Sequence, residues 1–175
     1  NALGTNTTGS DNVAVGVIAL KLNSTGDKNV AIGRSALEDH TTGDSNTAVG
    51  YEALNKNTTG TMNTAVGAFA LDANVGAGNY NTAMGGDSLS ANTTGEQNTA
   101  FGYGALESNT TADGNTAFGQ GAAAANTTGT RITAIGKGAY TASDTENDNL
   151  AIGYNAMTAN TAGGVENVAV GNYAL

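Results

Sequence analysis

Amide, hydroxyl, phenol and carboxylate side chains recur along this sequence at a fixed spacing, and each type could contact a ligand. The phrase NTAVGYEALNKNTTG, which begins at Asn46, holds an asparagine at its start, a tyrosine in its middle and a pair of threonines near its end. Tyrosine is common at contact surfaces because its ring is apolar and its hydroxyl group forms hydrogen bonds. The chemistry that these residues offer is non-covalent binding.

Catalytic groups are scarce. His40 is the single histidine and there is no cysteine, so neither a zinc site nor a catalytic triad can be assembled. The glycines are spread along the chain instead of forming a phosphate-binding loop. We expect no catalytic activity, no cofactor and no bound metal ion.

The composition argues against a conventional globular core. The 175 residues include 26 glycines and no proline, cysteine or tryptophan, and large side chains that fill an interior are few. A net charge of −9 argues against nucleic acid and anionic membrane surfaces as partners, because both attract clustered lysine and arginine. No apolar run reaches the ~20 residues of a membrane-spanning helix, so we expect no membrane insertion by this segment.

An internal repeat organises the whole chain. The phrase NTAVGYEAL at Asn46 returns as NTAVGAFAL at Asn63, and ten copies follow one another with a step of 17 residues, or 18 at two places. The extra residues fall in the links, near 76–78 and 163–164. Counted from the start of the phrase, position 3 is always alanine, position 4 is large and apolar, position 5 is always glycine, and position 9 is usually leucine. Constant phrases joined by variable links are typical of stacked coils.

This spacing predicts an all-β fold, a parallel β-solenoid of about ten 17-residue coils, with residues 1–175 as a single repeat domain. Regular glycines and β-branched residues give no stripe of period 3.6, so a helix is a poor interpretation. We expect two short strands and two bends in each coil, with equivalent positions stacked at about 4.8 Å. The residues that represent this structural repeat are Ala48, Val49, Gly50, Leu54, Ala65, Val66, Gly67, Leu71, Ala100, Phe101, Gly102 and Leu106.

The strand of each repeat is apolar on both sides. Positions 3 and 4 point to opposite faces of a strand, whereas a single coil has only one interior. Strands that are apolar on both faces are normally covered on both. We therefore expect other copies of the chain to cover the second face, with small alanine and glycine columns that permit close approach.

The phrase N-[TV]-A-[VI]-G followed by x-x-A-L resembles the YadA-like head repeat of trimeric autotransporter adhesins. The resemblance covers essentially the whole chain, and it implies a homotrimeric, left-handed parallel β-roll whose Asn-x-Ala-Val/Ile-Gly strand lies near the trimer axis. The repeats here are longer than the commonest repeat of that family, and we expect any neck, stalk or anchor to lie outside this segment. A phage tail fibre built from the same repeat is the alternative.

The resemblance also implies a function and a place. The chain would be a segment of a longer bacterial fibre, on the cell surface or secreted. The fibre would attach to another cell, a matrix or a glycan surface, or would space such an attachment. Its partners would be two further copies of itself and a cell-surface protein or glycan receptor.

Two columns of polar residues have alternative interpretations. We expect the asparagines at position 1 to form a structural amide ladder, because stacked amides bond along the column and asparagine tolerates the left-handed region at a corner. The threonines at position 2 could instead order water, as in ice-binding solenoids, although threonine is expected in strands in any case. The six threonines are Thr47, Thr64, Thr82, Thr99, Thr116 and Thr133.

Glycosylation sequons and acidic residues also recur. The sequons at Asn6, Asn57, Asn92, Asn109 and Asn126 match the turn chemistry of the links, so we discount glycosylation. The acidic residues near positions 16 and 17 lack the pattern of calcium-binding solenoids, and we expect a solvated edge that keeps fibres apart. These acidic residues are Asp11, Asp27, Asp44, Glu96, Asp113, Asp148 and Glu166.

Three tyrosines share position 6, namely Tyr51, Tyr103 and Tyr154. Tyrosines on an outer wall would make contacts with protein or carbohydrate. We therefore take them as candidate outer contacts, and expect any specificity to lie at such variable positions.

Overall fold

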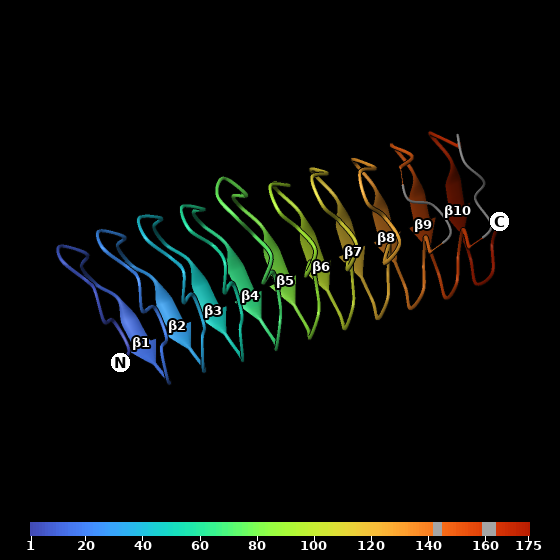
Figure 1. Ribbon diagram of the computed structural model, residues 1–175. Helices are drawn as coiled ribbons and strands as arrows, with labels where there is room; N and C mark the ends of the chain where they lie inside the picture. The colour runs from blue at the N-terminus through green and yellow to red at the C-terminus, as the bar shows by residue number, and fades with distance from the viewer. Residues whose placement is uncertain (142–144, 159–163) are drawn as a thin grey trace.

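Ten three-residue strands, one in each repeat, pair side by side in the order in which they occur in the chain. The computed structural model describes residues 1–141, 145–158 and 164–175. All nine neighbouring pairs are parallel, and the strands follow one another along a rod from the N-terminus to the C-terminus (Figure 1). The strands are β1 (Val13–Val15), β2 (Val30–Ile32), β3 (Thr47–Val49), β4 (Thr64–Val66), β5 (Thr82–Met84), β6 (Thr99–Phe101), β7 (Thr116–Phe118), β8 (Thr133–Ile135), β9 (Leu150–Ile152) and β10 (Val168–Val170).

The register places identical positions of successive repeats opposite each other. Ala48 of β3 pairs with Ala65 of β4, and Ala65 pairs with Ala83 of β5 across the longer 18-residue step. The extra residue of that step lies in the link, where Gly76 has a φ of 97°. Gly163, at the second insertion, lies outside the described residues. The predicted β-solenoid of 17-residue coils is confirmed, with about nine complete turns between the first and the last strand.

The interior of each coil is lined by small and medium apolar side chains. The alanines at positions 3 and 8 and the leucine at position 9 are buried, as Ala48, Ala53 and Leu54 illustrate in the third coil. Stacked over the coils, these columns form one continuous apolar core. The predicted repeat residues with 0% exposure are Ala48, Leu54, Ala65, Leu71, Ala100 and Leu106.

The second strand that we expected in each coil is absent from the described residues, and the expectation of two strands per coil is wrong. Positions 7 and 9 adopt left-handed backbone conformations, as in Glu52 (φ 54°) and Leu54 (φ 50°). This segment nevertheless bonds to the next coil, because Leu54 N donates to the Ala70 carbonyl at 3.0 Å. Both sides of each coil are therefore hydrogen-bonded between coils, although only one side is a regular strand.

Asparagine ladders fill the polar part of the interior. Asn46 donates from Nδ2 to the Gly60 carbonyl at 2.8 Å, and its Oδ1 accepts from the backbone N of Asn63 in the next coil at 3.0 Å. Asn57, at position 12, donates to the same Gly60 carbonyl at 3.1 Å. The predicted structural role of the position 1 asparagines is confirmed. The reason that we gave from left-handed geometry is wrong, because the residue before Asn46, Ser45, has the positive φ.

Both ladders tolerate a substitution, by a hydrogen-bonding side chain in one and by an apolar side chain in the other. His40 occupies the position of Asn57 one coil earlier, fully buried, with Nε2 at 2.7 Å from the Gly43 carbonyl oxygen and Nδ1 at 3.0 Å from the Asn57 carbonyl oxygen. In the eighth coil Ile132 replaces the position 1 asparagine, and the hydroxyl group of buried Tyr140 bonds to the Glu146 carbonyl at 3.1 Å. The single histidine and one of the tyrosines are therefore parts of the core.

Candidate interaction surfaces

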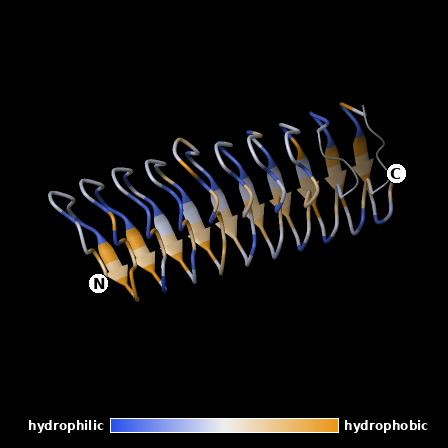
Figure 2. Cartoon of the chain, viewed as in Figure 1, coloured by the Kyte–Doolittle hydropathy of each residue, from blue (hydrophilic) through white to orange (hydrophobic). Residues whose placement is uncertain are grey.

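The outer face of the sheet is formed by positions 2 and 4 of every strand. Because alanine at position 3 points inward, its two neighbours point away from the coil. Val15, Phe118 and Val170 are 57%, 52% and 64% exposed, and Figure 2 shows apolar colouring at the strands of both ends of the rod. Of the predicted repeat residues, Val49 and Val66 are partly exposed and Phe101 is 42% exposed. Our expectation that alanine columns permit close approach on this face is wrong, since those columns lie inside the coil.

Two phenylalanines make this face unusually apolar at its middle. The rings of Phe101 in β6 and Phe118 in β7 stack with centroids 4.7 Å apart and planes within 9° of parallel. Both rings are exposed, and because they stack they form a contiguous apolar surface. Large contiguous apolar patches on a protein surface usually mark an interaction site.

The threonine ladder lies on the same face. The six position 2 threonines pair in register from Thr47 to Thr133, and their side chains make no hydrogen bond within the described part of the chain. Thr99 and Thr116 are exposed. Their hydroxyl groups are therefore free to bind water or a partner.

The three candidate tyrosines are exposed but lie apart. Tyr51 packs edge-on against Phe69 of the next coil at 5.2 Å, and Tyr154 packs similarly against Tyr173 at 5.3 Å. Tyr103 is 59% exposed. The pKa of Tyr51 is raised by its neighbour Glu52, and that of Tyr103 by Asp87. The tyrosines do not form one site.

The sequence interpretation missed a hollow in the fourth and fifth coils, which lie between the coils of Tyr51 and Tyr103. It is lined by Phe69, Asp72, Asp87, Ser90 and Ala91 and has a volume of about 430 Å³. Burial raises the pKa of Asp72. Positions 7, 10 and 11 of neighbouring coils meet here, and no repeated phrase in the sequence indicates it.

The acidic edge proves to be partly structural. Carboxylates at position 16 accept backbone hydrogen bonds from the coil before, so Asp27 accepts from Ser10 N at 2.7 Å and Asp44 from Asp27 N at 2.8 Å. The Ser10 backbone N–H and hydroxyl lower the pKa of Asp27. These carboxylates remain partly or fully exposed, as expected of a solvated edge, and they also link neighbouring coils.

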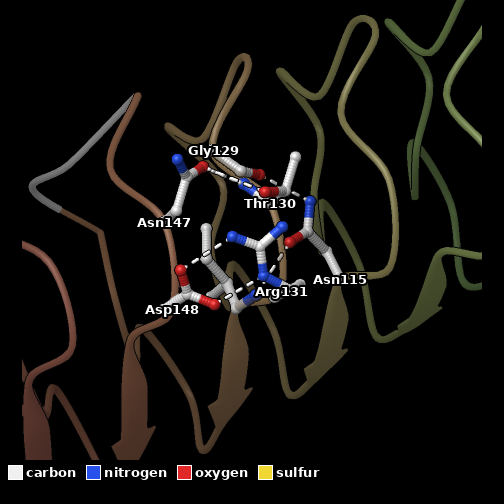
Figure 3. A network of polar contacts seen from close by, with 7 residues as sticks. Asn115, Gly129, Thr130, Arg131, Asn147 and Asp148 are labelled. Atoms are coloured by element: carbon white, nitrogen blue, oxygen red, sulfur yellow. Dashed lines mark hydrogen bonds and ion pairs between the residues drawn. The ribbon is translucent and has the colours of Figure 1, made fainter.

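The same edge holds a bidentate ion pair (Figure 3). Arg131 donates from Nε to Oδ1 of Asp148 at 2.5 Å and from Nη2 to Oδ2 at 2.7 Å. Beside it, Thr130 donates from its backbone N and hydroxyl to Oδ1 of Asn147 at 2.7 and 3.0 Å. Complementary side chains at equivalent positions thus link successive coils along the edge.

Four of the five sequon asparagines are inaccessible in the folded chain, whereas Asn6 is exposed. Asn57, Asn92, Asn109 and Asn126 are fully buried within the ladder, which agrees with their interpretation as structural. Residues 1–141, 145–158 and 164–175 contain no cluster of metal-ligating side chains and no helix that could cross a membrane.

The fold and these surfaces define a class, the parallel β-solenoid repeat proteins. No protein family matches the chain, and no curated protein or solved structure matches it significantly.

Proposed function

We propose that the chain is a homotrimeric, left-handed β-roll segment of a bacterial fibre, exposed on the cell surface or secreted, and similar to YadA-like heads. The exposed apolar face of the sheet is the observation that carries this proposal. Its Val, Ile, Met and Phe side chains stand outside the coil interior, and burial of apolar area is the main driving force for association. Two further copies of the chain would cover this face around a shared axis.

The fibre would act by adhesion or by spacing an adhesive tip. Successive coils present similar side chains at similar spacing, so weak contacts with a cell-surface protein or glycan would add up through multivalency. No group of residues proposed here performs a reaction, and no cofactor is required. A phage tail-fibre shaft would use the same trimer.

Sedimentation equilibrium tests the trimer. We expect a mass three times that of the 17.2 kDa chain, and we expect the Phe101→Ser/Phe118→Ser variant to sediment as a monomer with an unchanged circular dichroism spectrum. Those rings would lie at the shared axis, and their loss removes apolar contact area. The matched control is Tyr154→Ser/Tyr173→Ser, which removes two exposed rings away from the sheet face and should remain trimeric. A wild-type monomer at micromolar concentration would refute the proposal.

Ice binding is the second candidate, favoured by the free hydroxyl groups of the in-register threonine ladder. Those threonines share their face with the protruding Phe101 and Phe118 rings, which suits protein packing better than contact with a flat ice plane. Thermal hysteresis separates the two functions, because a gap between the melting and freezing points requires a face that adsorbs to ice.

A further inference from the structure

The hollow beside Phe69 combines an aromatic wall with polar groups. Phe69 is 37% exposed, and Asp87 occupies the equivalent position in the next coil. Gly86, beside Asp87, has no side chain, and the Tyr103 ring lies 3.4 Å from its ideal Cβ position. Asp72, Asp87 and Ser90 supply oxygen atoms around the ring. Concave sites with one apolar wall and a few convergent polar groups are typical of ligand binding.

The charge around the hollow is negative. Asp72 lies in the field of Glu52 and Asp87, and Lys56 is the cation that acts on it. Neither Asp72 nor Asp87 forms an ion pair with any described lysine or arginine. Burial disfavours the charged form of Asp72 and outweighs the attraction of Lys56, so an incoming positive group would relieve the remaining cost.

An arginine of this chain already lies over an aromatic ring that has a carboxylate beside it. One coil before Phe69, the guanidinium of Arg34 lies over the Tyr51 ring, 5.8 Å from its centroid, with Glu52 beside the same tyrosine. Cations are attracted to the faces of aromatic rings, and neighbouring carboxylates strengthen that attraction. Phe69 offers the same combination of ring and carboxylates with no arginine of this chain over it.

We propose that the hollow formed by Phe69, Asp72, Asp87 and Ser90 binds a guanidinium or ammonium group on a basic partner surface. The inference rests on the proposed adhesive role and names the class of receptor, which is a protein surface rich in arginine or lysine. The net charge of −9 would steer such a partner toward the rod.

Fluorescence anisotropy with a rhodamine-labelled Gly-Arg-Gly-Arg-Gly peptide tests this site on the 175-residue chain. The matched probe replaces both arginines by citrulline, which keeps the shape and removes the charge. We expect the arginine peptide to bind about tenfold more tightly. Asp72→Asn/Asp87→Asn should weaken its binding about tenfold, and Phe69→Leu about threefold.

The control variant is Asp11→Asn/Glu166→Gln, which removes the same charge at exposed positions and should change binding less than twofold by screening alone. Equal binding of the citrulline peptide, displacement of the arginine peptide by lactose, or an equal loss in the control variant would overturn the site. Sedimentation of the same samples separates the two proposals. A trimer without arginine selectivity would refute the binding site and leave the trimeric fibre standing. A monomer that keeps the selectivity would refute the trimeric fibre and leave the binding site standing.

Discussion

His40 shows how one residue can interrupt a ladder without interrupting the fold. In neighbouring coils the position 12 amide donates to the Oδ1 atom of the asparagine in the coil before, as Asn74 does to Asn57 at 3.0 Å. His40 cannot reach Asn23 in this way, and Asn23 Oδ1 is buried with no hydrogen-bond partner among the described residues. A buried acceptor without a donor costs about 1–3 kcal/mol.

We therefore predict that His40→Asn stabilises the chain. The new amide would donate both to Asn23 Oδ1 and to the Gly43 carbonyl, and the free energy of unfolding should rise by about 1–2 kcal/mol in urea titrations at about pH 8. His40→Leu is the control, because it removes the ring but leaves Asn23 Oδ1 unpaired, and it should destabilise the chain. A His40→Asn variant no more stable than the wild type would contradict the ladder argument.

The same pair of proteins should differ in pH dependence. Burial lowers the pKa of His40 below its ordinary value of 6.5, despite the carbonyls of Gly43 and Asn57 and the nearby Asp44. The unfolded chain therefore binds the proton more readily than the folded chain. Wild-type stability should fall as the pH drops below 6.5, and the difference between wild type and His40→Asn should widen there. A constant difference would show that the pKa of His40 is the same in the folded and the unfolded chain, and would contradict the lowered pKa.

At the scale of the coil, the residue after each strand from β1 to β9 must be glycine because the backbone of the next coil leaves no room for a side chain. A Cβ atom on Gly102 would lie 2.6 Å from the carbonyl carbon and oxygen of Gly119, at a φ of 134°. Gly121 has a φ of 64°, but nothing lies within 4 Å of its Cβ position. An alanine at position 102 would therefore meet both a steric conflict with the next coil and an unfavourable φ, whereas an alanine at position 121 would meet only the unfavourable φ.

Alanine substitutions at these glycines should have different costs. We predict that Gly121→Ala lowers the free energy of unfolding by about 1 kcal/mol, the cost of a left-handed alanine. Gly102→Ala should lower it by about 3 kcal/mol or more, because the methyl group forces two coils apart. Denaturant titration of both variants gives the comparison. Equal losses would mean that the coils are not in close contact at this column.

The left-handed segment explains which parts of the coil were predictable. The strand could be predicted because successive side chains of a strand point to opposite faces, so that the Thr, Ala and Val of the phrase indicate which face is buried. The return segment could not, because non-glycine residues such as Glu52 and Leu54 rarely adopt positive φ, and only stacking against the next coil compensates for it. The hollow at Phe69 was missed for a related reason, since its residues come from three different positions in two coils.

At the scale of the whole molecule, equivalent coils should be interchangeable. Deletion of one full repeat, residues 98–114, would bring β5 against β7 with the register preserved, because these strands differ by whole repeats. We predict that this variant folds with an unchanged circular dichroism spectrum per residue and melts a few degrees lower. Deletion of residues 98–105 shifts the register and should prevent cooperative unfolding. Similar behaviour of the two deletions would contradict the stacked-coil description.

The register that pairs each strand only with its neighbours also determines how a single chain would respond to tension. Force applied between its two ends would load the coils one after another, so the rod would lengthen in discrete steps instead of stretching smoothly. Each step would release one coil of 17 residues, or about 60 Å of extended chain. Such a rod would dissipate the work of a sudden pull by unfolding one coil at a time, while the remaining coils stay folded.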